Sequence, residues 1–377
     1  MWITVPFILL FILYALLLFF YRKSWQQMPE VEVEERYSPQ TSISVIIAAR
    51  NEEKNIANCL FSVLEQHFDP QLFEVIVVDD HSEDHTAEIV NRLCTIYSNL
   101  SCINLKAQEN IIAYKKKAIT TGINKAKGKL IVTTDADCIV PENWLKNIAA
   151  FYENKKLVFI AAPVVIAPGK GLVKLFQSLD FLSLQGITGA SVFAQFHTMC
   201  NGANLAYEKK VFEEVNGFDG VDTIASGDDM LLMHKVFLKY PDKVQYLKSK
   251  AAIVQTAPAN NWAEFFNQRI RWASKAGKYD DKRIFWVLLL VYLFNLSFLI
   301  IFITAFFVGE FWMYLISLLL LKTLYELFFM IPVAKFFNKE TQLWWFPLMQ
   351  PLHILYTITA GLLGSITTYT WKGRKVK

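Results

Sequence analysis

The chain contains apolar runs that are long enough to cross a lipid bilayer. Residues 2–21 and 284–308 carry no charged side chain, and residues 311–334 carry only Lys322 and Glu326. A membrane-spanning helix needs about 20 consecutive apolar residues. Lys322 and Glu326 are one helical turn apart, so we expect them to form an ion pair. The runs predict membrane helices towards both ends and confine any soluble domain to the sequence between them.

Basic residues beside the apolar runs predict their orientation. Arg22 and Lys23 follow the first run directly, which favours a cytoplasmic position for that end. A last apolar segment, 343–371, is broken by prolines and precedes a basic tail, 372–377, that suits anionic headgroups. Counting crossings places the loop 335–340 in the cytoplasm, yet the tail also favours the cytoplasm. We therefore expect the last segment to be interfacial or re-entrant.

Composition supports a membrane protein with a cytosolic domain. Hydrophobic residues make up 54% of the chain, and the mean hydropathy of +0.28 is too high for an ordinary soluble protein. Five cysteines without a C-x-x-C pair indicate reduced thiols. The net charge of +4 does not suggest a nucleic-acid partner. We expect a multi-pass protein of the inner or plasma membrane.

The sequence after an acid-rich linker, 23–41, alternates between strand and helix patterns. Such alternation predicts a Rossmann-like, mostly parallel sheet flanked by helices, which is an α/β fold. The expected strands are 43–48, 74–78, 102–105, 130–135 and 159–165, and the expected helices are 52–66, 86–97, 113–125 and 171–184. The last of these has a one-sided apolar pattern that favours a core helix over a membrane-surface helix.

Three of the predicted strands end in polar residues. These ends are residues 49–52, Asp79 with Asp80, and Asp135 with Asp137. Right-handed crossovers place all three ends on one edge of the sheet. Asp135 and Asp137 are two positions apart and point to the same side, so they could bind Mg²⁺ or Mn²⁺ carried by a diphosphate. The alternatives are a solvated acidic turn and, for Asp79 and Asp80, simple capping of the next helix.

Two later segments carry further chemistry. Asp228 and Asp229 precede an apolar helix, where one carboxylate could cap the helix and the other could act as a base. A helix opened by Asn260 or Asn261 carries an amide, an indole and two cations on one face, which suits a diphosphate. The alternative is an interfacial helix at the membrane boundary. The residues on that face are Gln268, Arg271, Trp272 and Lys275.

Together these motifs resemble the family 2 glycosyltransferases, the group that includes cellulose, chitin and hyaluronan synthases and ceramide glucosyltransferases. The motifs D, D-x-D, (E/D)-D and Q-x-x-R-W occur in the family's order between Ser42 and Lys278. The resemblance implies a GT-A fold, a nucleotide-diphosphate sugar donor such as a UDP-sugar, a divalent metal and inversion at the transferred sugar. It divides the chain into an anchor 1–22, the linker, a cytosolic catalytic domain 42–283, a membrane region 284–371 and the tail.

The resemblance also implies roles for individual residues. Asp229 matches the general base, although Asp228 stands where the family usually has Glu, so either carboxylate could act. Asp137, with Asp135, would bind the metal, and Trp272 would line the acceptor site. Tyr114 replaces a common Gly, which leaves Lys116 and Lys117 as alternatives to Lys115. The implied donor-binding residues are Ala49, Arg50, Glu52, Asp79, Asp80, Lys115, Asp135, Gln268, Arg269, Arg271 and Trp272.

Three functions are compatible with the motifs. The small number of apolar segments favours single transfer to a lipid over a processive polysaccharide synthase, because a polymer channel needs more helices. A non-catalytic nucleotide-sugar sensor or export subunit predicts loss of a catalytic carboxylate. Every motif acid is present, which argues against that third function.

Overall fold

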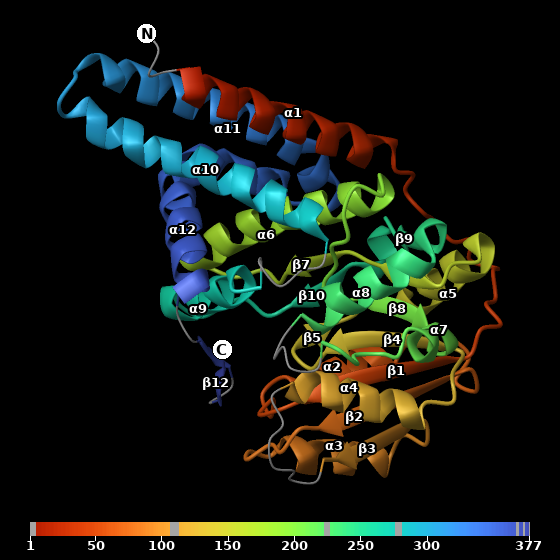
Figure 1. The fold of residues 1–377 in the computed structure, drawn as a ribbon. Coiled ribbons are helices and arrows are strands. Elements are labelled where there is room, and N and C mark those ends of the chain that lie inside the picture. Colours follow the sequence, from red (N-terminus) through yellow and green to blue (C-terminus); the bar gives the residue numbers. More distant parts are fainter. Residues whose placement is uncertain are drawn as a thin grey trace.

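The centre of the protein is a seven-stranded sheet flanked by helices, as predicted (Figure 1). The computed structural model describes residues 5–105, 113–221, 227–275, 281–366, 369–371 and 374–376. Within them the strand order is β3-β2-β1-β4-β8-β6-β9, and β8 alone runs antiparallel to its neighbours. The strands are β1 (Ile43–Ala49), β2 (Phe73–Asp79), β3 (Leu100–Asn104), β4 (Leu130–Asp135), β6 (Phe159–Ala161), β8 (Leu205–Glu208) and β9 (Val244–Tyr246).

Both faces of the sheet are buried, which explains the continuous apolar strands. In β1, Ile46 packs with helix α4, whereas Val45 and Ile47 pack on the opposite face with α2, α3 and α5. The helices are α2 (Ile56–Leu64), α3 (Thr86–Cys94), α4 (Tyr114–Lys125), α5 (Trp144–Lys155), α6 (Leu172–Phe193), α7 (Lys209–Glu214), α8 (Asp228–Lys239) and α9 (Trp262–Ala273). Short 3₁₀ turns are η2 (Pro241–Lys243), η3 (Lys250–Ala252) and η4 (Glu340–Trp345).

Two predicted boundaries are wrong. The expected strand 159–165 is divided at Pro163 into β6 and β7 (Val164–Ile166), because proline has no N–H for the ladder. Strand β7 instead joins a second sheet, in the order β5-β10-β7, with β5 (Cys138–Ile139) and β10 (Val254–Thr256). The helix expected from residue 52 begins at Ile56, because residues 50–55 form a turn. The predicted core helix is confirmed as α6, which is longer than expected.

Three helices in the described part of the chain are long and apolar enough to cross a membrane. They are α1 (Val5–Gln27), α10 (Lys282–Ala305) and α11 (Glu310–Phe336). The start of α1 and the turn between α10 and α11 lie at the same end of the protein, far from the sheet (Figure 1). The predicted ion pair is confirmed, since Lys322 Nζ lies 2.6 Å from Glu326 Oε1 and both residues are buried.

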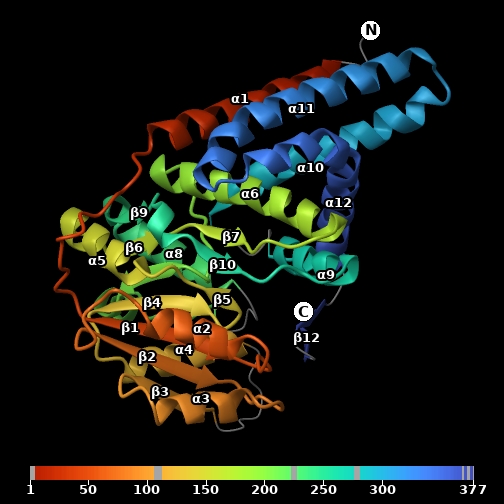
Figure 2. The same cartoon turned by 180° about the vertical axis from the view of Figure 1, so that it is seen from behind.

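The last apolar helix, α12 (Phe346–Ile366), differs from these three. It is not among the candidate membrane spans, and it lies across the direction of α1, α10 and α11 in both views (Figures 1 and 2). Two glycines permit its close packing, because a Cβ at Gly361 or Gly364 would lie 2.7 Å from Tyr292 of α10 or Ala273 of α9. A short hairpin of β11 (Tyr369–Trp371) and β12 (Arg374–Val376) follows. Lys278 and tail residues 372, 373 and 377 lie outside the described residues.

One hydrophobic cluster joins the sheet to the three candidate membrane helices. It runs from Ile46 and Ile131 in the sheet through α6 and α8 to α1, α10 and α11. Lys248 also fixes the end of α1, because its ammonium donates to the carbonyls of Trp25 and Met28 at 3.0 and 3.1 Å. The α/β domain and the three candidate membrane helices therefore share one core.

Candidate active site

The three polar strand ends meet on one edge of the sheet, as predicted. Strands β1, β2 and β4 are parallel neighbours, and their register places Ala49 beside Asp79 and Ala48 beside Asp135. The buried Arg50 guanidinium donates to the carbonyls of Asp80 and His81 at 2.9 and 2.7 Å. It thereby joins the turn after β1 to the turn after β2.

The acids after β2 contact their own turn. Asp79 accepts from the Ser82 N–H at 3.1 Å, and an oxygen of Asp80 lies 2.9 Å from His81 Nδ1. The first N–H of α3 donates to Asp84 at 3.0 Å, so Asp84 fills the capping role that the alternative gave to Asp79 and Asp80. Asp80, Glu52, Arg50 and Ala49 line a cavity.

A lysine joins the acids of β4 and α8. Lys115 Nζ lies 2.6 Å from Asp135 and 3.6 Å from Asp228, whereas Lys116 donates to the carbonyl of Val221. Lys115 is therefore the residue of its basic run that reaches this site. Burial alone would lower the pKa of the Lys115 ammonium, but the carboxylates of Asp135 and Asp228 raise it above its ordinary value.

Asp229, in the first turn of α8, accepts hydrogen bonds from two backbone N–H groups. One of its oxygens accepts from Gly202 at 2.9 Å and the other from Met230 at 2.8 Å. Gly227, the residue directly before α8, has a φ of 81°, in the left-handed region that glycine adopts without strain. Burial, and then the neighbouring charge of Asp228, raises the pKa of Asp229. Burial lowers the pKa of the nearby Lys275 ammonium to about 8.

Asp135 and Asp137 supply carboxylate oxygens suited to a hard cation. Both line the cavity, and both lie close enough to raise the pKa of Cys138, after the larger effect of burial. That protonated thiol is a poor metal ligand. The described residues contain no cluster of three His, Cys, Asp or Glu side chains able to hold a metal alone. The pair therefore fits a cation whose other ligands are diphosphate oxygens and water.

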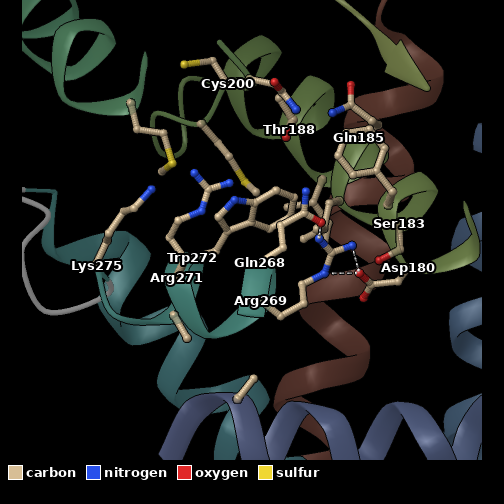
Figure 3. Close-up of a pocket in the computed structure, with 18 of the residues that line it drawn as sticks. Asp180, Ser183, Gln185, Thr188, Cys200, Gln268, Arg269, Arg271, Trp272 and Lys275 are labelled. Carbon is tan, nitrogen blue, oxygen red and sulfur yellow. Dashed lines mark hydrogen bonds and ion pairs between the residues drawn. The ribbon is translucent and has the colours of Figure 1, made fainter. Parts of the chain in front are cut away.

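The predicted cationic helix is α9, and Asn261 caps it by accepting from the Glu264 N–H at 2.9 Å. In Figure 3, Arg271 and Lys275 point away from Asp180, whereas Arg269 points towards it. Arg269 Nε donates to Asp180 at 2.8 Å, and the guanidinium lies 4.2 Å from the centre of the Trp272 ring. Its Nη1 donates to Gln268 at 2.8 Å.

The cavity runs from these acids to the membrane helices and has a volume of about 820 Å³. Its lining includes Asp137, Asp228 and Asp229 at one end and residues of α1, α10, α11 and α12 at the other. Every residue of the sequence-based site except Asp79 lines it. Lining residues that sequence reasoning missed are Tyr14, Asp180, Glu326, Gln350 and His353. Each of them is a polar residue within an apolar segment of the sequence, and that pattern could have identified them.

Two family models match the chain. "Glycosyl transferase family 2" matches residues 44–215, and "Glycosyl transferase family group 2" matches residues 130–366, which is more than half of the chain. A solved mannosyltransferase from Pyrobaculum calidifontis, PcManGT, has a TM-score of 0.60 and 18% identity, covering 95% of this chain and 96% of that one. It shares the fold.

Known relatives show similar partial matches. Glycosyltransferase AglE of Haloferax volcanii is 36% identical over 182 residues, or 48% of this chain and 53% of AglE. The probable glycosyltransferase YdaM of Bacillus subtilis is 26% identical, over 61% of this chain and 54% of YdaM. A poly-β-1,6-N-acetyl-D-glucosamine synthase of Staphylococcus aureus is 26% identical, over 67% of this chain and 58% of its own. The chain thus spans little more than half the length of these relatives. With its GT-A-type α/β fold, it belongs to glycosyl transferase family group 2.

Proposed function

We propose that the chain transfers a sugar from a nucleotide-diphosphate donor, a UDP-sugar, to a hydroxyl group of a membrane lipid, with inversion and with a divalent metal. The observation that carries the proposal is the cavity, which joins the strand-end acids to the helices that can cross a membrane. A donor bound at the acids and a lipid entering from the membrane could then meet beside Asp229. The sequence-based site residues are proposed in these roles.

The proposal includes a topology with the catalytic domain, 42–283, in the cytoplasm. Arg22, Lys282 and Lys335 lie at the sheet-side ends of α1, α10 and α11, which agrees with the positive-inside rule. Three crossings place the end of α11 and the tail on one side, provided that α12 does not cross. The transverse direction of α12 supports an interfacial position (Figure 1).

At the donor end of the cavity, the acids are proposed to bind the metal and the cations to bind the diphosphate. Asp135 and Asp137 would hold Mg²⁺ or Mn²⁺, which stabilises the charge that develops on the diphosphate. The family 2 match supports this role, and PcManGT was solved with GDP-Man and Mn²⁺. Arg271 and Lys275 line the same cavity and add positive charge for the leaving diphosphate. Arg269 is proposed as a donor ligand only through its contact with Gln268.

Asp229 is the proposed base. Its two backbone hydrogen bonds orient the carboxylate, and its raised pKa makes it a stronger base than an ordinary Asp. It would take the proton of the acceptor hydroxyl as that oxygen forms a bond to the anomeric carbon. The bond to the diphosphate breaks on the opposite face, and its electron pair leaves with the diphosphate. Inversion follows from this geometry.

The test is a transfer assay with membranes that contain the full-length protein. Membranes are incubated with individual radiolabelled nucleotide sugars and Mn²⁺ or Mg²⁺, and the products are separated into organic and aqueous phases. We expect one labelled sugar per lipid in the organic phase, and no such product with Asp229→Asn. Absence of both transfer and diphosphate release with every donor would refute the proposed activity.

A processive polysaccharide synthase is the second candidate, and the similarity to the poly-β-1,6-N-acetyl-D-glucosamine synthase favours it. The same assay distinguishes the two, because a synthase would yield labelled polymer of high molecular mass. The number of candidate membrane spans among the described residues, three, supports the lipid acceptor instead.

A further inference from the structure

The part of the cavity farthest from the sheet is lined by polar residues of α1, α11 and α12. We call it the membrane arm and define it by Tyr14, Glu326, Gln350 and His353. Tyr14 donates to Glu326 at 2.5 Å, and the Gln350 amide donates to its other oxygen at 2.5 Å. Buried polar groups in a membrane bundle are costly to maintain and commonly mark a substrate path.

Charges around the membrane arm occur in pairs. Lys322 lies 2.6 Å from Glu326 and also donates to Gln350 at 2.7 Å. Towards the acids of the sheet, Arg269 pairs with Asp180, whose other oxygen lies 3.9 Å from His353 Nε2. A phosphate headgroup would need positive charge that these acids do not already neutralise. The paired charges therefore favour an uncharged headgroup over an anionic one.

One buried nitrogen in the membrane arm is left for a ligand. His353 Nδ1 has no hydrogen-bond partner within the described residues, although it is shielded from solvent. A buried polar atom without a partner costs about 1–3 kcal/mol, so a bound polar group that satisfies it gains affinity. A hydroxyl group can serve, because it donates or accepts and matches either tautomer of the ring. The hydroxyl oxygen of Tyr14, which also lines the membrane arm, can accept a hydrogen bond in addition to the one that it donates to Glu326.

We place the opening of the cavity, its apolar mouth, between α10 and α12, because apolar residues there line the cavity and are partly exposed. Phe285 and Leu288 of α10 and Leu362 of α12 line the cavity and are 39%, 42% and 48% exposed. Acyl chains leaving through this mouth would lie along helices that border the membrane. The mouth and the membrane arm thus offer an apolar exit beside a neutral polar pocket.

We infer that the membrane arm is the acceptor subsite and that it takes an uncharged lipid with a free hydroxyl, of the diacylglycerol type. The headgroup would contact His353 and Tyr14, and the acyl chains would leave between α10 and α12. Only the claim that the bound lipid receives the sugar rests on the proposed function. The binding site itself can be tested without any sugar donor.

The test is lipid binding to full-length protein in detergent micelles, without nucleotide sugar. A fluorescent diacylglycerol is displaced either by dioleoylglycerol or by dioleoyl phosphatidic acid, which has the same chains and an anionic headgroup. We expect dioleoylglycerol to compete at least tenfold better. Equal or better competition by phosphatidic acid would overturn the choice of an uncharged lipid, and no displacement by either would overturn the site.

Two variants locate the binding site. His353→Ala should weaken dioleoylglycerol binding about five- to tenfold, as expected for one lost hydrogen bond. His67→Ala, at an exposed histidine, is its matched control. Leu288→Trp should block the mouth, whereas Leu355→Trp, on the exposed side of α12 outside the cavity lining, should not. Unchanged binding in both His353→Ala and Leu288→Trp would refute the location.

The transfer assay tests the proposed function, and the binding assay tests the lipid site, so either claim can be refuted without the other. If dioleoylglycerol binds as expected but no sugar is transferred to any lipid, the proposed function is wrong and the lipid site stands. If transfer occurs to an anionic lipid alone, the proposed function stands and the inference about an uncharged acceptor is wrong.

Discussion

Replacing Asp180 by leucine removes one charge of an ion pair that is almost fully enclosed. The Asp180 and Arg269 side chains are 4% and 2% exposed, and Arg269 Nε lies 2.8 Å from Asp180. The pair joins α6 to α9, so it connects the core helix to the helix of the Q-x-x-R-W motif. Arg269 also lies over the rings of Phe265 and Trp272 at 4.7 and 4.2 Å.

The expected magnitude follows from two opposing contributions. At an effective dielectric constant of about 20, charges 2.8 Å apart attract by about 6 kcal/mol. Removing both charges from water costs several kcal/mol for each, so the intact pair contributes little net stability. In Asp180→Leu, the desolvation cost of the buried Arg269 charge remains, but the attraction to Asp180 is lost. The free energy of unfolding should therefore fall by about 3–5 kcal/mol. The double variant Asp180→Leu/Arg269→Met removes both charges and should recover most of the loss.

The assay is thermal unfolding of detergent-purified protein, followed by tryptophan fluorescence. At roughly 2 °C per kcal/mol, the single variant should unfold about 6–10 °C lower than the parent, and the double variant within about 3 °C of it. Glu88→Leu breaks the exposed pair between Arg92 and Glu88 and serves as the control, with an effect below about 1 kcal/mol. A double variant as unstable as the single one would refute the reasoning, because the unpaired charge would then not be the cause.

The same double variant decides the role of Arg269. If its stability recovers while UDP binding weakens, Arg269 contributes to donor binding as the motif implies. If stability and UDP binding both recover, its role is to position α9.

Three further predictions concern the reaction. Asp229→Asn should abolish transfer while UDP binding changes less than about twofold, and residual turnover near that of the parent would exclude Asp229 as the base. Asp137→Ala should remove the Mn²⁺ dependence of UDP binding measured by calorimetry, and an unchanged metal dependence would count against its role as a ligand. The pH profile of kcat/KM should fall on the acid side as Asp229, with its raised pKa, takes up a proton. It should fall above about pH 8 as the Lys275 ammonium loses its proton. Lys275→Arg should remove only the alkaline fall, because arginine stays charged.

Local patterns predicted the parts of the site that depend on local geometry. The strand ends could be located because buried parallel strands appear as apolar runs, and their carboxyl ends must share an edge. The cap of α9 could be narrowed to Asn260 or Asn261 from their place before a helical pattern, and the structure shows that it is Asn261. The pairing of Lys322 with Glu326 followed from their spacing alone.

Contacts between distant segments were beyond such reasoning. Asp180 looked like one polar residue in a core helix, and its partner Arg269 lies 89 positions later. The break between β6 and β7 lies at Pro163, which has no N–H for the ladder, but periodicity does not report that β7 joins the second sheet. The packing of α12 against α9 and α10 depends on close contacts at Gly361 and Gly364, which the apolar pattern does not report.

The hydrogen bond between Tyr14 and Glu326 joins residues 312 positions apart. The ribosome synthesises α1 before the α/β domain, and the whole α/β domain is synthesised before α11. During that interval Tyr14 has no Glu326 to accept its hydroxyl proton, so α1 cannot reach its final packing on its own. Assembly of the membrane arm is therefore among the last events of biosynthesis. A nascent chain stopped before α11 should hold a folded sheet beside a loosely associated first helix, which quality-control proteases would recognise.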